Sequence, residues 1–199
     1  MNHVFVPGAT ARAPVVLLHG SGGDEHELIA LAADVAPGSP AVGVRGSAPF
    51  GNGHAFFHRR PDRTIDEADL VERIPVLAAF LSSVRAEHGL VRPPVAIGFS
   101  NGAIMTAALL MTHPRLLAGA ILFRPLSPFA EDPPTRLDGK PVLILDGAKD
   151  DRRAPEDGAH LADRLRAAGA VVTHRVLPVG HAITPEDRRI ALEWMCERE

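Results

Sequence analysis

The residues best suited to chemistry form a five-residue run, Gly98-Phe99-Ser100-Asn101-Gly102, which matches the pattern Gly-x-Ser-x-Gly. An apolar, strand-like segment precedes the run and a helical pattern follows it. A serine on a tight turn between strand and helix takes a strained backbone conformation, and glycines on either side leave room for neighbouring elements. The helix start also directs free N–H groups at a substrate oxygen. This context predicts Ser100 as a nucleophile; the alternative is an ordinary glycine-rich turn.

A nucleophilic serine needs a base to take its proton. In enzymes built on this turn, the acid and then the histidine follow the serine along the chain. The histidines beyond the serine are His113, His160, His174 and His181. The first is expected at a helix end, the second within a helix and the third within a strand. His181 lies just beyond the last strand-like run, where parallel sheets place their active sites, so we expect it to be the base.

The base in turn needs a carboxylate that orients its imidazole ring. The acid should lie just after the strand-like run that ends near Asp146. Asp146, Asp150 and Asp151 all compete for that role. Asp146 stands beside Gly147 and fits a turn or capping residue better. Spacing alone does not separate Asp150 from Asp151.

A glycine-rich segment, 19–24 (HGSGGD), follows the first core strand-like run. One of its backbone N–H groups, together with the N–H of Asn101, would complete an oxyanion hole beside Ser100. A phosphate-binding loop is the alternative. The chain contains neither GxxxxGK[ST] nor GxGxxG, so no nucleotide cofactor is expected.

Strand-like and helical patterns alternate along almost the whole chain. The strand-like runs are Val4–Val6, Pro14–His19, Pro40–Val44, Pro94–Phe99, Leu117–Phe123, Pro141–Asp146 and Val171–Leu177. The helical patterns are Glu25–Val35, Ile65–His88, Asn101–Thr112, Glu156–Ala168 and Pro185–Glu197, the last with Thr184 as its expected cap. Most of the runs are continuously apolar, as in strands covered on both faces. We therefore expect an α/β fold: a mostly parallel sheet with helices on both faces, in one domain spanning residues 1–199.

Two long connections, Arg45–Arg63 and Leu126–Gly139, interrupt the alternation. Connections of that length in a compact domain are more often functional than idle. Both are too short and too broken by glycine or proline to form a helical lid, which predicts a shallow cleft that favours short acyl groups. Side chains that could wall this substrate pocket are Phe50, His54, Phe56, Phe57 and His58. Arg124, expected at the end of a strand on the same edge of the sheet, could contact a substrate carboxylate there. As alternatives, the phenylalanines would pin the loop to the core and the arginine would form a structural salt bridge.

Composition narrows the class of protein. Of 199 residues, 46% are hydrophobic and 23% are charged, which excludes disorder. The net charge of -3 argues against binding to nucleic acid or anionic membranes. A single cysteine, Cys196, excludes an internal disulfide and a cysteine-based zinc site, and we expect no metal or cofactor. With no membrane span and no secretory signal pattern at the start, we expect a cytoplasmic protein that acts on a small molecule. Whether the protein forms a homodimer is left open by the sequence.

Four segments, LLHGSGGDEHEL, GFSNGA, GAKDDRRAPE and VGHAITPED, resemble the small bacterial carboxylesterase/phospholipase branch of the α/β-hydrolase superfamily. This branch is related to the acyl-protein thioesterases and more distantly to the dienelactone hydrolases. The resemblance extends over nearly the whole chain. It implies a carboxylesterase that forms an acyl-enzyme. The alternatives are a thioesterase or lysophospholipase with the same triad, and a non-catalytic binding protein of this fold.

The resemblance also assigns residues. The family pattern G-x-x-D fits Gly147 to Asp150 without a gap, which implies Asp150 as the acid. It implies the N–H of Ser21 as the second oxyanion donor. The chain departs from the family in the turn that follows the acid, where Asp151 to Pro155 (DRRAP) stand in place of apolar residues before the proline.

Overall fold

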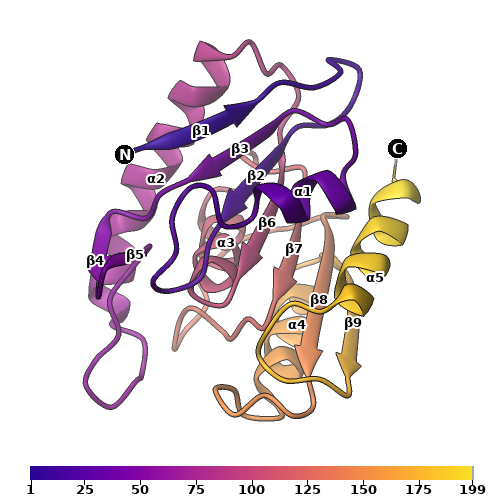
Figure 1. Ribbon diagram of the computed structural model, residues 1–199. Coiled ribbons are helices and arrows are strands. Elements are labelled where there is room, and N and C mark those ends of the chain that lie inside the picture. The colour runs from indigo at the N-terminus through magenta and orange to yellow at the C-terminus, as the bar shows by residue number, and fades with distance from the viewer. Residues whose placement is uncertain (199) are drawn as a thin grey trace.

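The computed structural model describes residues 1–198, and its centre is a seven-stranded sheet (Figure 1). The strands are β1 (His3–Val6), β2 (Val15–Leu18), β3 (Ala41–Val44), β6 (Val95–Phe99), β7 (Gly119–Phe123), β8 (Pro141–Gly147) and β9 (Val171–Leu177). They lie in the order β1-β3-β2-β6-β7-β8-β9. Only the edge pair β1 and β3 is antiparallel, so the expected mostly parallel sheet is confirmed.

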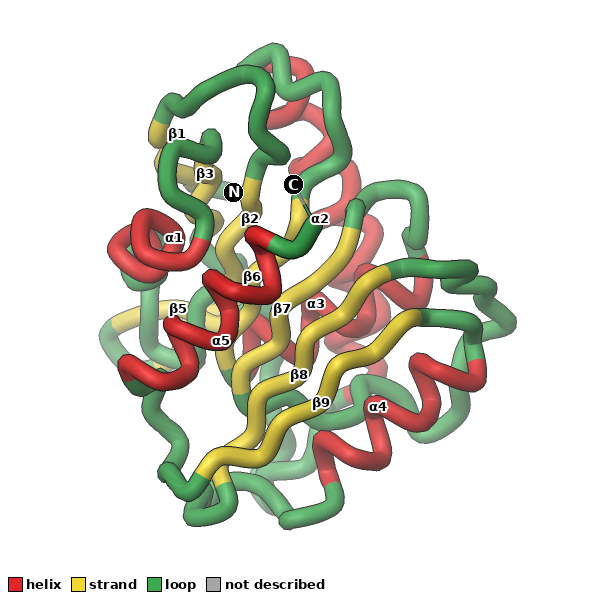
Figure 2. Tube along the Cα trace, turned by 90° about the vertical axis from the view of Figure 1, so that its right-hand side faces the viewer, coloured by secondary structure: helices red, strands yellow, loops and turns green. Residues whose placement is uncertain are grey.

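Helices cover both faces of this sheet, as Figure 2 shows. They are α1 (Ile29–Val35), α2 (Glu67–Glu87), α3 (Asn101–Thr112), α4 (Asp157–Ala167) and α5 (Pro185–Cys196). Along β2, Val15 and Leu17 pack with α1 and α5, whereas Val16 and Leu18 pack with α2, α3 and α4. Because successive strand side chains point to opposite faces, both sets must be apolar, which explains the continuous runs. Within residues 1–198, no helix is long and apolar enough to cross a membrane.

The strand order reverses beside β2. Strand β3 lies on one side of β2, and the next sheet strand in the chain, β6, lies on the other. Leu18 therefore pairs with Gly98 at the carboxyl ends of neighbouring strands. In open α/β sheets a ligand binds in the crevice at such a switch point. The glycine-rich segment 19–24 and the turn at Ser100 both leave the sheet there.

The long connection after β3 is more ordered than its sequence indicates. It contains a hairpin of β4 (Ala48–Phe50) and β5 (Gly53–Ala55), with Ala48 opposite Ala55. Strands of three residues are too short to show a period of two, so the sequence did not reveal this hairpin within the connection. The turn at Gly51 has a φ of +56°, a conformation that favours glycine.

The sequence predicted the start of helix α5 correctly but not the start of helix α1. The expected cap of α5 is present: the Thr184 hydroxyl accepts from the Asp187 N–H, and the Asp187 carboxylate accepts from the Thr184 N–H. Helix α1, by contrast, begins only at Ile29. The expected start at Glu25 was wrong: residues 25–28 form turns, and the Glu25 side chain is paired with Arg45, whose Nε donates to it over 2.5 Å.

Candidate active site

Ser100 occupies the turn between β6 and α3 with a φ of +52° and a ψ of -107°. Its N–H donates to the carbonyl of Phe123 over 2.9 Å, which holds this strained conformation. A Cβ at Gly98 would lie 2.6 Å from the carbonyl oxygen of Gly102. A Cβ at Gly102 would lie 2.0 Å from the carbonyl oxygen of Leu18. The two glycines of the motif are thus required by close approach of the following helix and the neighbouring strand.

A continuous row of hydrogen bonds joins Ser100, His181 and Asp150. The Nε2 of His181 lies 3.0 Å from the Ser100 Oγ, and its Nδ1 lies 2.7 Å from an Asp150 carboxylate oxygen. A carboxylate only accepts, so Nδ1 carries the proton and Nε2 is left to accept from the serine hydroxyl. The row has the arrangement by which a histidine activates a serine nucleophile.

The structure separates the three candidate acids. The side chain of Asp150 is 1% exposed, and its second oxygen accepts from the Arg152 N–H over 2.8 Å. Asp151 is exposed to solvent. Asp146 contacts His174 instead, with 2.7 Å between its carboxylate and Nε2. Only Asp150 is hydrogen-bonded to His181 among these three.

Burial sets the protonation of His181. It lowers the pKa of the imidazole, while the hydrogen bond to Asp150 acts in the opposite direction and the positive charge of Arg153 lowers it further. The ring also packs against Phe99, with 5.2 Å between centroids. At neutral pH the imidazole is therefore uncharged and able to accept a proton.

The two expected oxyanion donors come from the start of α3 and from the glycine-rich segment 19–24. Asn101 is the first residue of α3, so its N–H has no acceptor within the helix. Ser21 is exposed in the glycine-rich segment and lines the same cleft as Ser100 and His181. Backbone N–H groups in these positions can stabilise a negatively charged oxygen above the serine.

The side chain of Asn101 has a second role that the sequence did not reveal. Its Oδ1 accepts from the N–H of Phe56 over 2.7 Å, and its Nδ2 donates to the carbonyl of Phe57 over 3.1 Å. Both bonds are buried, which makes them costly to break. The amide therefore ties the long loop to the nucleophile turn. The sequence signal for this role is that Asn101 is a polar residue among the small and apolar residues at the start of α3.

His19 ties the same loop to the glycine-rich segment. The Gly46 N–H donates to its Nε2 over 3.0 Å, so Nδ1 carries the proton and donates to the carbonyl of Gly20 over 2.6 Å. Burial lowers the pKa of this imidazole and keeps it neutral. The two hydrogen bonds of His19 thus hold the glycine-rich segment, which is expected to stabilise the oxyanion, against the long loop.

Four of the six side chains expected at a substrate pocket do not line the cleft at Ser100: those of His54, Phe56, Phe57 and Arg124. Phe56 and Phe57 are 2% and 1% exposed and pack into the core. They therefore pin the long loop to the core, which was the alternative, and do not wall the pocket. Arg124 is fully buried and binds both carboxylate oxygens of Asp187, each over 2.8 Å, so its charge is already neutralised. His54 lies in β5 and lines an adjoining hollow beside residues 21–24, which shares Ser21 and Glu27 with the cleft at Ser100.

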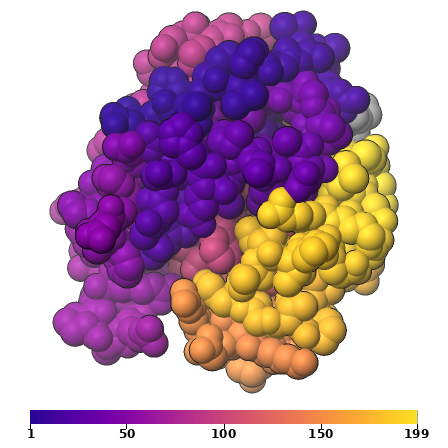
Figure 3. Space-filling view, in the orientation of Figure 1, coloured from indigo at the N-terminus to yellow at the C-terminus, as the bar shows by residue number. Residues whose placement is uncertain are grey.

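The cleft at Ser100 has a volume of about 680 Å³, within the usual range for small-molecule sites. Phe50 and His58 line one side of it, and the turn after Asp150 lines the other. Figure 3 shows the recess between the purple projection of the long loop and the orange segment near residue 150. The loop therefore does wall the cleft, but through other side chains than the buried phenylalanines.

Arg153 lies in the turn 151–155, where the sequence departs from the family that it resembles. Its Nη2 donates to the Ser100 Oγ over 3.0 Å, and its Nε donates to the carbonyl of Arg124 over 2.8 Å. Burial, followed by the charge of Arg59, lowers the pKa of Arg153 to about 10. A guanidinium therefore contacts the nucleophile directly, which the sequence did not predict.

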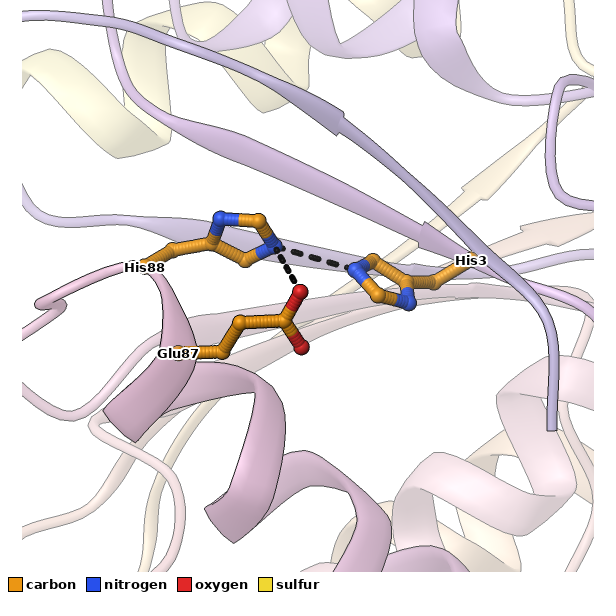
Figure 4. Close-up of side chains that lie close together, drawn as sticks. All are labelled: His3, Glu87 and His88. Carbon is orange, nitrogen blue, oxygen red and sulfur yellow. Dashed lines mark hydrogen bonds and ion pairs between the residues drawn. The ribbon is translucent and has the colours of Figure 1, made fainter.

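Among the described residues 1–198, one three-residue group could offer ligands to a metal ion: His3, Glu87 and His88, at the edge strand β1 and the end of α2 (Figure 4). The two Nε2 atoms lie 3.0 Å apart, and a Glu87 oxygen lies 3.8 Å from the His88 Nε2. Two nitrogens on one tetrahedral zinc would be about 3.3 Å apart. The observed spacing is that of a hydrogen bond between the imidazoles, and the group is separate from the Ser100 cleft.

The chain is similar to a curated bacterial protein. It is 35% identical over 198 residues to the protein named "Putative hydrolase MhqD" from Bacillus subtilis (strain 168), which covers 99% of this chain and 98% of that protein. No family model matches the chain.

Solved structures show the same architecture. A carboxylesterase from Bacillus cereus superposes with a TM-score of 0.95 at 35% identity, covering 99% of this chain and 94% of that one. A carboxylesterase from Mesorhizobium loti gives 0.88 at 33% identity, covering 92% and 88%. A structure of YahD with malic acid gives 0.94 at 26% identity, covering 100% and 99%.

Proposed function

The chain belongs to the small bacterial carboxylesterase branch of the α/β-hydrolase superfamily, and from that premise we propose that it is a serine hydrolase that cleaves carboxylic esters of small molecules. The observation that carries the proposal is the 3.0 Å approach of the His181 Nε2 to the Ser100 Oγ, with Asp150 on the far side of the ring. The proposal takes residues 1–199 as a single domain and includes a cytoplasmic location, which cell fractionation tests.

In the first half of the reaction, the Ser100 Oγ attacks the ester carbonyl carbon and its proton passes to the His181 Nε2. The carbonyl oxygen becomes an oxyanion between the N–H groups of Ser21 and Asn101. When the carbon–oxygen bond to the alcohol breaks, His181 returns the proton to the leaving oxygen. The acyl group remains bound to the serine.

In the second half, water attacks the acyl-enzyme and gives a proton to His181. Collapse of the new oxyanion releases the carboxylic acid, and the proton returns to Ser100. Throughout, Asp150 holds the Nδ1–H tautomer and stabilises the imidazolium that forms at each transfer. No step needs a metal or a cofactor.

Kinetics of four variants test the proposal. Ser100→Ala and His181→Ala should each lower hydrolysis of p-nitrophenyl butyrate by about 10⁴ or more, because such residues act as a unit. Ser82→Ala and His160→Ala are matched controls, since both side chains are exposed on helices and neither lines the cleft at Ser100. A Ser100→Ala or His181→Ala variant that kept a tenth of the wild-type rate would defeat the assignment.

A further inference from the structure

The cleft at Ser100 is strongly cationic although the chain as a whole is acidic. Its lining includes five arginines, Arg59, Arg60, Arg63, Arg152 and Arg153. Only two carboxylates line it, those of Glu27 and Asp151. The chain carries a net charge of -3, so this excess of positive charge is local. A cleft lined by one sign of charge concentrates ligands of the opposite sign.

These five arginines differ from most others in having no carboxylate partner. Elsewhere, Arg124 is paired with Asp187 and Arg45 with Glu25. Within residues 1–198, none of the five in the cleft has a carboxylate oxygen within 4.0 Å. Their hydrogen bonds go to uncharged oxygens where they have any, as from Arg59 to the carbonyl of Arg63 over 2.7 Å. Asp157 acts on Arg59 and Arg153 at longer range, as Asp150 does on Arg153, but no carboxylate of the described chain contacts the five guanidinium groups, so each can still bind an anionic ligand.

The positive charge of Arg59 also acts on Arg153. Burial lowers the pKa of Arg59, and burial together with the charge of Arg59 lowers the pKa of Arg153. Arg153 is fixed at the nucleophile by its 3.0 Å bond to the Ser100 Oγ. An anion placed between the two groups would relieve their repulsion and would lie beside the reacting bond.

The two opposing carboxylates do not neutralise this charge. Asp151 is exposed to solvent. Glu27 lies against Gly20 and Gly23 of the glycine-rich segment, and burial raises the pKa of its carboxyl. Neither is paired with an arginine of the cleft in the described chain.

We propose that the cleft selects esters that carry an anionic group, a carboxylate or a phosphate, in the acyl or the alcohol part close to the ester bond. The inference rests on the proposed ester hydrolysis at Ser100. Planar guanidinium groups bind both kinds of oxyanion through paired hydrogen bonds, which a neutral substituent of the same shape does not accept equally well.

Matched pairs of substrates test the selection. Monoethyl glutarate is compared with ethyl 5-oxohexanoate, in which a methyl ketone replaces the carboxylate of the acyl part. 4-Acetoxybutanoate is compared with 5-acetoxypentan-2-one, which makes the same change in the alcohol part. We expect kcat/KM for the charged member of at least one pair to be higher by about tenfold, the effect of a few partly exposed ion pairs. Equal or lower values in both pairs would overturn the proposal.

Variants connect that preference to the arginines. Arg60→Gln and Arg152→Gln, from opposite walls of the cleft, should each lower the charged-to-neutral ratio about threefold, and added salt should lower it in the wild type. Arg136→Gln is the control, because that side chain is 86% exposed and pairs with Asp138 outside the cleft. A ratio that neither cleft variant changes would contradict the assignment to these residues.

Two further measurements identify the preferred anion and distinguish failure of the proposed substrate class from failure of the proposed function. Ethyl 4-phosphonobutanoate in the same assay shows which anion the cleft prefers; a preference for either one supports the proposal. A fluorophosphonate probe reports serine activation without any substrate preference. Labelling with no charged-to-neutral preference overturns only the substrate class, whereas no labelling and no hydrolysis of any ester overturns the proposed function itself.

Discussion

The Nη2 of Arg153 donates a hydrogen bond to the Oγ of Ser100 over 3.0 Å, the same distance that separates that oxygen from the Nε2 of His181. The serine oxygen can therefore accept from the arginine while donating to the histidine. The guanidinium charge favours negative charge on the oxygen as its proton leaves. It also opposes the imidazolium and lowers the pKa of His181.

The pH dependence of esterase activity should show this coupling. Burial and Arg153 lower the pKa of His181 from its ordinary 6.5, so the wild-type acid limb of kcat/KM for a neutral ester should have its midpoint below pH 6.5. Arg153→Met removes the charge and raises that pKa, so activity should be lost at a higher pH as the solution is acidified. Arg166→Met, at an exposed pair with Asp163, should leave the limb in place. A lower midpoint pH of the acid limb in Arg153→Met than in the wild type would contradict the account.

The identity of the acid is tested by a neighbouring pair of substitutions. Asp150→Asn keeps the shape of the side chain but removes the charge that fixes the imidazole tautomer, and should lower kcat by about 10⁴. Asp151→Asn should be mild because that carboxylate is exposed. Steady-state kinetics on p-nitrophenyl butyrate would separate them, and reversed effects would assign the acid to Asp151.

Much of this site followed from the sequence because its signals are local. The strand, tight turn and helix around Ser100 are encoded within a dozen residues, and the glycines at 98 and 102 are forced by contacts at 2.6 and 2.0 Å. The apolar runs likewise follow from burial on both faces of the sheet.

The features that the sequence did not reveal depend on contacts between distant segments. Phe56 and Phe57 are buried because the Asn101 amide holds their backbone from 44 or more positions away. Arg124 turns inward because Asp187, in the last helix, neutralises its charge. Such pairings leave no periodic pattern in the chain.

The buried amide of Asn101 should contribute measurably to stability. Asn101→Ala leaves the N–H of Phe56 and the carbonyl of Phe57 without partners, at a cost of about 2 kcal/mol or more in the free energy of unfolding. Urea unfolding followed by circular dichroism would measure it. Asn52→Ala, at an exposed position near the hairpin turn, is the control. Equal midpoints for the two variants would show that the tie between loop and turn is dispensable.

Substrate length is limited by the walls of the cleft. They are formed by loops and not by a helical lid, so only a few methylenes can be buried, at about 0.8 kcal/mol each. Short esters, acetyl to about hexanoyl on that estimate, should give the highest kcat/KM, with no increase in rate at the micelle threshold. A series of p-nitrophenyl esters measures this. Values that kept rising to the palmitoyl ester would favour a lysophospholipase or thioesterase.

The central claim is that Ser100 becomes covalently bound to the acyl group. A fluorophosphonate that reacts with activated serines should add one adduct to the intact protein, and peptide mapping by mass spectrometry should place it on Ser100. The adduct should be absent from Ser100→Ala and His181→Ala and unchanged in Ser82→Ala. An adduct on another residue, or full labelling of Ser100→Ala, would contradict the account.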